Sequence, residues 1–369
     1  MDTSSQVRRR HRPGATLSGL ASMRVELALG LITVVYTVCV FAVSSAVGLS
    51  EQVSLWLYSE AVFMVSFLVI FSAAILRVLY IMLALRPVRL TRFILADFRN
   101  FLCGEQRLLR ALPVLLLFLV FISVFTSYKA MIPELQPFVW DETFIAWDRI
   151  LHGGHDPWRL LQPLLGYPEL SGALNVVYNA WFPAMFTVLY WQLFSLSRPQ
   201  LRARFLLSFF LTWILLGSLV ATLLSSAGPC FLEPLFGNNY YQPLMSYLQQ
   251  AAQQAPVWAL DTQAMLLRSH LGSESGLGAG ISAMPSLHVA TALLIALTCW
   301  GSGRWLRGFG LLFLLLILLG SVHLGWHYAV DGYLAIALTL PIWWGCGWLA
   351  QRLVPSSENF VQSSLKSHS

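Results

Sequence analysis

The residues best suited to chemistry lie at the two ends of an apolar hairpin between Ser282 and Asp331. One end contains Ser286 and His288 in the run Pro-Ser-Leu-His, and the other runs from His327 to Asp331 as His-Tyr-Ala-Val-Asp. Two apolar runs joined by a short turn separate these ends. If both runs cross a membrane, the two ends return to the same depth. The pattern therefore predicts that the two polar clusters form one buried site.

The first cluster has the composition of a helix start. Pro285 suits the first turn of a helix and Ser282 is a candidate cap, so the amides near Ser286 and His288 are expected to lack helical partners. Free amides at the positive end of a helix dipole bind anions. The Ser286 hydroxyl adds a donor, and His288 can hold a proton for a leaving oxygen. This cluster is typical of a site for a phosphate-like group.

The second cluster combines imidazoles with a carboxylate. His327 and Asp331 are four residues apart, which predicts that they share one face of a helix and form a hydrogen bond. A carboxylate on one ring nitrogen fixes the tautomer and leaves the other nitrogen as a base or nucleophile. His323, one turn earlier, extends this row.

Three interpretations fit that row of polar residues. It can serve phosphoryl transfer, it can coordinate a divalent ion through His323, His327 and Asp331, or it can form structural hydrogen bonds inside a helix bundle. Spacing alone leaves all three open.

The elements that must position these residues are membrane helices. Apolar residues make up 57% of the 369 and charged residues only 11%, against about a quarter in ordinary globular domains. This composition predicts an all-α, polytopic membrane helix bundle. A span needs roughly 20 mostly apolar residues. Eight segments qualify: 27–49, 55–85, 111–128, 170–196, 205–225, 286–302, 309–326 and 329–350.

The net charge of +6 is explained by where the basic residues lie. With the N-terminus in the cytoplasm, all but four of the 23 Lys and Arg residues fall on the cytoplasmic side; the four are Lys129, Arg149, Arg159 and Arg268. That asymmetry follows the positive-inside rule and removes any need for a nucleic-acid partner. It also places both ends of the hairpin on the non-cytoplasmic side.

The chain divides into four parts on this basis. We expect a disordered cytoplasmic tail at 1–23, two accessory spans with an interfacial cytoplasmic segment at 24–110, the core at 111–352, and a loose cytoplasmic tail at 353–369. Within the core, an outer loop predicts an amphipathic helix along the membrane surface, because its large apolar residues recur every three or four positions: Trp140, Phe144, Trp147 and Leu151. The long outer segment 226–280 predicts a partly helical lid.

These residues resemble the type-2 phosphatidic acid phosphatase superfamily, whose motifs read K-x6-R-P, P-S-G-H and S-R-x5-H-x3-D. Met284 to His288 is similar to the second motif, and the run ending in His327 and Asp331 is similar to the third. Leu287 stands where the second motif has glycine. That leucine and the Tyr-x-Val-Asp type of ending resemble the inositol phosphorylceramide synthase branch, the inositolphosphotransferases, more than other members. The resemblance implies a six-helix phosphatase core within the predicted bundle.

The resemblance also implies roles for single residues. His327 would be the nucleophile that takes the phosphoryl group, Asp331 would orient it, and His288 would protonate the leaving oxygen. Ser286 would bind a phosphate oxygen, and Lys129 occupies the lysine position of the first motif. We also expect His323 to contribute to substrate binding.

Two motif arginines are missing from this chain. Gln136 replaces the arginine of the first motif, and Ser321 stands where the third motif has its arginine. Arginine forks are the usual clamp for phosphoryl oxygens. Another basic residue would therefore have to compensate.

The resulting hypothesis is an integral membrane lipid phosphatase or phosphotransferase that acts on a phospholipid or lipid phosphate through a phosphohistidine, with no metal and no cofactor. Its partners are expected to be that substrate and the membrane lipids. The alternatives are a transporter or lipid-binding membrane protein that uses the same His/Asp row, and a catalytically inactive member of the family.

Overall fold

The computed structural model describes residues 14–103, 107–272 and 280–354. Over these ranges the chain is helical and contains no strand, which confirms the predicted all-α bundle. The helices long and apolar enough to cross a membrane are Met23–Ala46, Ser59–Leu85, Arg107–Leu135, Pro199–Leu223, Arg304–His323 and Ala329–Leu353. The predicted total of eight spans is not confirmed.

Two predicted spans form shorter helices. The segment 170–196 is divided into α7 (Pro168–Asn179) and α8 (Trp181–Phe194), which meet at Ala180. Pro183 helps to explain this break, because it has no N–H to donate to the carbonyl of Asn179. The segment 286–302 contains α14 (Leu287–Cys299), whose 13 residues extend for about 20 Å.

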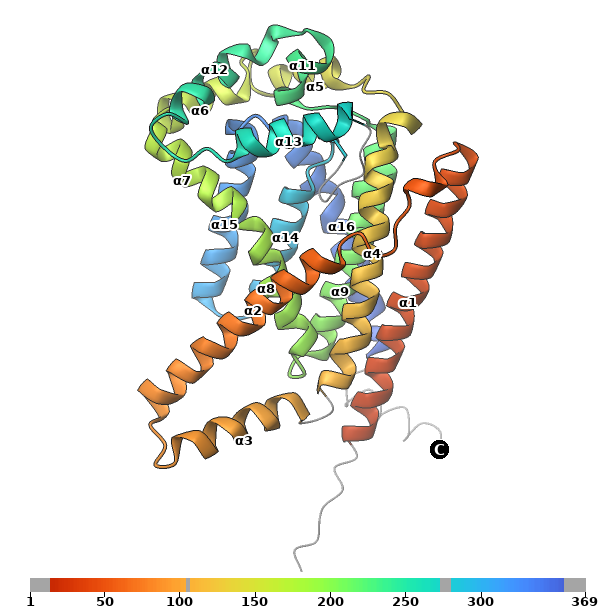
Figure 1. Ribbon diagram of the computed structural model, residues 1–369, viewed down its shortest axis with the longest axis vertical. Helices are drawn as coiled ribbons and strands as arrows, with labels where there is room; N and C mark the ends of the chain where they lie inside the picture. The colour runs from red at the N-terminus through yellow and green to blue at the C-terminus, as the bar shows by residue number, and fades with distance from the viewer. Residues whose placement is uncertain (1–13, 104–106, 273–279, 355–369) are drawn as a thin grey trace, which may run out of the picture.

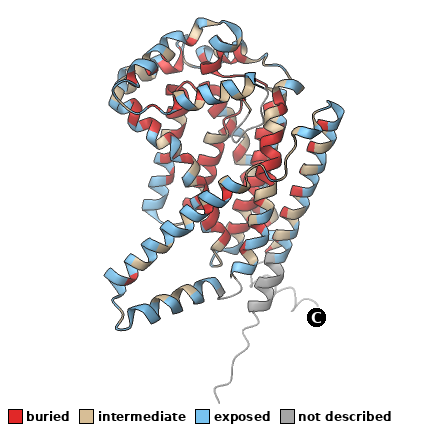
Figure 2. Cartoon of the chain, viewed as in Figure 1, coloured by how far each residue is buried: buried red, intermediate tan, exposed pale blue. Residues whose placement is uncertain are grey.

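The central bundle contains α14 and five longer helices that run beside one another (Figure 1). These are α1 (Gly14–Ala46), α4 (Arg107–Leu135), α9 (Pro199–Ile214), α15 (Arg304–His323) and α16 (Ala329–Leu353). A π turn and the short α10 (Ala221–Leu223) extend α9. Aromatic residues fill much of the core, since Phe118, Phe121, Phe209 and Phe210 are fully buried. Figure 2 shows the buried residues concentrated along these central helices.

The N-terminal helices differ in how closely they join the bundle. Helix α1 packs against α4 and α9, whereas α2 (Ser59–Tyr80) runs obliquely away from them and is mostly exposed (Figures 1 and 2). Helix α3 (Leu90–Cys103) lies across the end of the molecule where α4 begins, and Asp97 in α3 pairs with Arg77 of α2 at 2.7 Å. The exposed apolar residues of α2 are suited to contact with lipid.

The predicted tails lie largely outside the described residues. Helix α1 begins at Gly14, within the segment expected to be a tail, and α16 ends at Leu353. The structure describes the chain only from residue 14 and only to residue 354.

A cap of short helices covers the opposite end of the bundle (Figure 1). It contains α5 (Asp141–Leu151), α6 (Pro157–Leu165), α11 (Leu232–Phe236), α12 (Gln242–Ala251) and α13 (Ala259–Leu271). The predicted lid is thus helical over most of its length, although residues 273–279 lie outside the described part. Helix α5 has one apolar side in the core, with Phe144, and another at the surface, where Ile150 is 75% exposed.

Candidate active site

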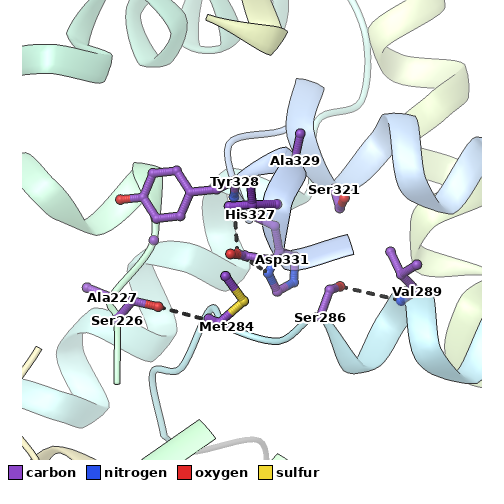
Figure 3. Close-up of polar contacts among 12 residues, drawn as sticks. Ser226, Ala227, Met284, Ser286, Val289, Ser321, His327, Tyr328, Ala329 and Asp331 are labelled. Atoms are coloured by element: carbon purple, nitrogen blue, oxygen red, sulfur yellow. Dashed lines mark hydrogen bonds and ion pairs between the residues drawn. The ribbon is translucent and has the colours of Figure 1, made fainter. Parts of the chain in front are cut away.

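His327 lies in a loop rather than on a helix face. Helix α15 ends at His323 and α16 begins at Ala329, so the expectation that His323, His327 and Asp331 line one helix is wrong. His327 and Asp331 still meet, because Asp331 is in the first turn of α16 and reaches back towards the loop. The His327 Nδ1 lies 3.1 Å from an Asp331 carboxylate oxygen, which also accepts the Tyr328 amide at 3.1 Å (Figure 3).

Backbone hydrogen bonds hold the loop in this shape. The amides of Trp326 and His327 both donate to the Ser321 carbonyl at 3.0 Å. The Ser321 side chain is fully buried and donates to the Leu318 carbonyl within α15. The residue that replaces the motif arginine therefore supports the His327 loop through its backbone.

Two acidic residues of α5 fix the same region from behind. The Asp148 carboxylate accepts the first two amides of α16, those of Ala329 and Val330, at 2.9 Å each. The Asp141 carboxylate accepts the Tyr328 hydroxyl at 2.7 Å and the amides of Ala227 and Gly228.

Both carboxylates are buried, whereas polar residues off the apolar face of an amphipathic surface helix are expected to face water. Their spacing of seven residues puts Asp141 and Asp148 on one helix face, and this pattern can be read from the sequence.

The second cluster caps α14 and joins it to α16. Ser286 is the N-cap, and its Oγ accepts the Val289 amide at 3.4 Å, while its own amide donates to the Asp331 carbonyl at 3.2 Å (Figure 3). The candidate cap Ser282 is therefore not the cap, and Pro285 precedes the helix. Ser286 is fully buried and is not among the residues that line the cavity described below. Its contacts tie the two motif segments together.

Aromatic rings position His288. Its ring centroid lies 4.8 Å from Tyr178 and 4.3 Å from Trp181, and the Trp181 indole N–H donates to the His288 carbonyl at 3.1 Å. The imidazole centroids of His288 and His327 are 6.0 Å apart. At this separation, with an interplanar angle of 62°, the two rings lie beside each other edge to face.

Both histidines line a cavity of about 330 Å³ beneath the cap. Lys129 from α4 lines it too, as do Tyr178 and Trp326. Of the described residues that form its wall, only Lys129 carries a formal charge. The lysine of the degenerate first motif therefore shares a cavity with the two motif histidines.

The other basic residues predicted on the same side, Arg149, Arg159 and Arg268, do not line the cavity. Arg149 donates to the Gly154 carbonyl, and Arg159 pairs with Asp156 at 3.0 Å, both within the cap. The two residues at the arginine positions of the motifs, Gln136 and Ser321, do not line the cavity either. Lys129 is thus the basic group that the fold brings to the histidines.

His323 faces away from this cavity. Its Nε2 lies 2.8 Å from the Ser171 Oγ, which also bonds the Tyr247 hydroxyl at 2.7 Å. It is fully buried and does not line the cavity. Across the described ranges, no group of three or more His, Cys, Asp or Glu side chains is arranged to hold a metal ion, so the proposed metal row does not assemble there.

The environment of His327 favours a neutral imidazole. Burial, reinforced by the positive charge of Lys129, lowers the pKa of His327 to about 3. With Nδ1 directed to the Asp331 carboxylate, the lone pair of a neutral ring lies on Nε2. The arrangement is suited to nucleophilic attack by Nε2.

Comparison with known families places this site in context. The family model described as the PAP2 superfamily matches residues 142–344, more than half of the chain and a range that includes His288, His327 and Asp331. Neither the curated proteins nor the solved structures contain a match to the chain. The matched range, together with the motif residues assembled in one membrane-bundle cavity, shows that the chain belongs to the PAP2 superfamily.

Proposed function

We propose that this protein is an integral membrane lipid phosphatase or head-group phosphotransferase, with His327 as its nucleophile. Members of the PAP2 superfamily are generally phosphatases or phosphotransferases. The observation that carries the proposal is the contact of His327 Nδ1 with the Asp331 carboxylate at 3.1 Å, where His327 lies beside His288 in the wall of a cavity that Lys129 also lines.

The first chemical step forms a bond between His327 Nε2 and the substrate phosphorus. The bond from phosphorus to the leaving oxygen breaks, and His288 supplies the proton that this oxygen takes up. Asp331 accepts the Nδ1 proton of His327 in a hydrogen bond and stabilises the positive charge that develops on the ring. Lys129 offsets negative charge on the non-bridging oxygens.

The second step transfers the phosphoryl group to an acceptor hydroxyl. His288, which lost its proton in the first step, takes the proton of the acceptor as the acceptor oxygen attacks phosphorus and the P–N bond breaks. Water as acceptor gives hydrolysis, and a lipid hydroxyl gives head-group transfer. The similarity of Leu287 and of the His-Tyr-Ala-Val-Asp segment to the inositol phosphorylceramide synthase branch supports transfer.

We further propose that the site faces the non-cytoplasmic side and that the N-terminus is cytoplasmic. The cavity lies at the capped end of the bundle, whereas Arg198 and the turn between α14 and α15 lie at the other end, where Arg198 donates to the Gly301 carbonyl at 3.0 Å. Arg304 and Arg307 follow that turn. Basic residues concentrate on the cytoplasmic side of membrane proteins.

The proposal is tested by incubating the purified protein with a panel of labelled phospholipids and lipid phosphates. We expect release or transfer of the labelled phosphoryl group by the native protein, and its loss in His327→Ala and in His288→Ala. Full turnover in both variants would refute the assignment. Binding or flipping of lipid with no phosphoryl release by the native protein would indicate a transporter or binding protein instead.

A further inference from the structure

Two hydrogen-bond donors on side chains that line the active-site cavity have no partner among the described residues. The Tyr178 hydroxyl and the Trp326 indole Nε1 are both buried, and neither bonds any atom of the described residues. Both side chains line the cavity that contains His288, His327 and Lys129. Burying a donor without a partner costs about 1–3 kcal/mol, so an unpaired pair at one site indicates that a ligand supplies the acceptors.

The two rings are held in fixed positions. Tyr178 stacks on His288, with an interplanar angle of 21°, and is nearly parallel to Trp326, at 10° with centroids 6.4 Å apart. Trp326 immediately precedes His327 in the loop, and its amide is fixed by the Ser321 carbonyl. Both side chains therefore share the cavity wall with His327, whose Nε2 meets phosphorus under the proposed function.

The charge of the cavity limits what those donors can bind. Lys129 is the one formally charged side chain among the described wall residues, and the Asp331 carboxylate lies directly behind His327. A phosphodiester carries one negative charge, which Lys129 balances. A phosphomonoester carries about −1.5 to −2 at pH 7, so part of its charge would remain buried without a counter-ion.

We propose that Tyr178 and Trp326 donate to the non-bridging phosphoryl oxygens in place of the missing arginines, and that this clamp selects a singly charged phosphodiester over a phosphomonoester dianion. The inference rests on the proposed function, because it assigns the substrate class of that same site. Neutral donors suit a monoanion, since they satisfy its oxygens and add no charge of their own. Two arginine forks would instead favour the dianion.

The test is a binding measurement in which no turnover occurs. The full chain carrying His327→Asn is titrated in detergent with dioleoyl phosphatidylglycerol, a diester, and with dioleoyl phosphatidic acid, a monoester of the same acyl chains. Native mass spectrometry gives both dissociation constants. We expect the diester to bind at least about tenfold more tightly at pH 8, and the preference to shrink as the pH falls through about 6 and the monoester takes up a proton.

Single substitutions in the same background test the donors. Tyr178→Phe keeps the ring that stacks on His288 and removes only the hydroxyl, so we expect diester binding to weaken by about tenfold to a hundredfold. Trp326→Phe should weaken it by a similar factor. Tyr190→Phe is the matched control, because Tyr190 is equally buried in α8 but bonds Ser66 and does not line the cavity.

The outcomes separate the inference from the function on which it rests. Unchanged diester binding in Tyr178→Phe and Trp326→Phe, or equal binding of the two lipids at pH 8, would overturn the inference. Selective binding that both substitutions weaken would support it. If such binding were found while the native protein released no phosphoryl group from any lipid, the proposed catalysis would fail and the assigned ligand class would remain.

Discussion

Asp148 offers a test of how the fold aligns His327, the proposed nucleophile, from outside the cavity. Its two carboxylate oxygens accept the Ala329 and Val330 amides at 2.9 Å each, at the start of the helix whose first turn contains Asp331. A hydrogen bond to a charged group contributes about 1.5–3 kcal/mol. Asp148→Asn keeps one acceptor oxygen and turns an NH₂ group towards the other amide, so it loses one such bond and leaves a buried donor unpaired.

The expected result is a loss of catalytic rate with little loss of substrate binding. The lost hydrogen bond misaligns His327 and Asp331, and if its full energy is added to the activation free energy, about 1.5–3 kcal/mol lowers kcat by roughly tenfold to a hundredfold. KM should change by less than about threefold, because Asp148 does not line the cavity that binds the substrate. A substitution that weakens only the transition state lowers kcat and leaves KM nearly unchanged.

The assay compares steady-state turnover of Asp148→Asn with that of Asp156→Asn. Asp156 is another buried carboxylate in the cap. Its side chain accepts the Tyr240 hydroxyl and pairs with Arg159, and none of its hydrogen bonds to the described residues reaches α16. We expect Asp156→Asn to keep nearly full kcat. Equal kcat in the two variants, with both folded, would show that Asp148 does not position His327 for catalysis.

Three further predictions concern the cavity and its pH response. Gly280→Ala should reduce activity more than Gly237→Ala. Both glycines have positive φ, but a Cβ at 280 would lie 2.7 Å from the Lys129 carbonyl, whereas a Cβ at 237 meets no atom within 4 Å. Equal effects of the two substitutions on turnover would contradict the close approach of Gly280 to Lys129. Lys129→Gln should lower kcat/KM by about tenfold to a hundredfold, since it removes the charge that offsets the phosphoryl group, and unchanged kcat/KM would show that Lys129 does not serve this role. Burial lowers the pKa of His327 to about 3, so the unfolded chain binds a proton that the folded chain excludes, and stability should fall as the pH drops from about 6.5 towards 3. His327→Gln should lessen that pH dependence in thermal unfolding at pH 4.5 and 7.5; an unaltered difference would show that His327 does not cause it.

The all-α membrane bundle was predictable because the apolar composition and the length of the apolar runs determine it. The sequence also predicted that the segments around His288 and His327 would share a site, since two helices of a hairpin return a chain to its starting depth. It did not resolve the break between α7 and α8 at Ala180. A proline near the start of α8 interrupts a run whose hydropathy alone looks continuous.

The details of the site depended on where helices end. Periodicity placed His323 in one row with His327, but α15 ends at His323, and the next residues form a loop. His323 therefore bonds Ser171 rather than lining the cavity. The inward position of Asp148 does not follow from the sequence either, because a carboxylate on a surface helix normally faces water unless buried amides, here those of Ala329 and Val330, are available to it. Such partners depend on tertiary packing, which local patterns do not encode.

The central claim is that His327 forms a covalent phosphoryl intermediate, and trapping that intermediate tests it most directly. Protein mixed with a phospholipid labelled at phosphorus is quenched within milliseconds in alkali, in which phosphohistidine survives, and is then digested and mapped by mass spectrometry. The account predicts label on the His327 peptide, lost on acid treatment and absent in His327→Asn. Label on another residue, or product formation in His327→Asn at the native rate, would contradict it.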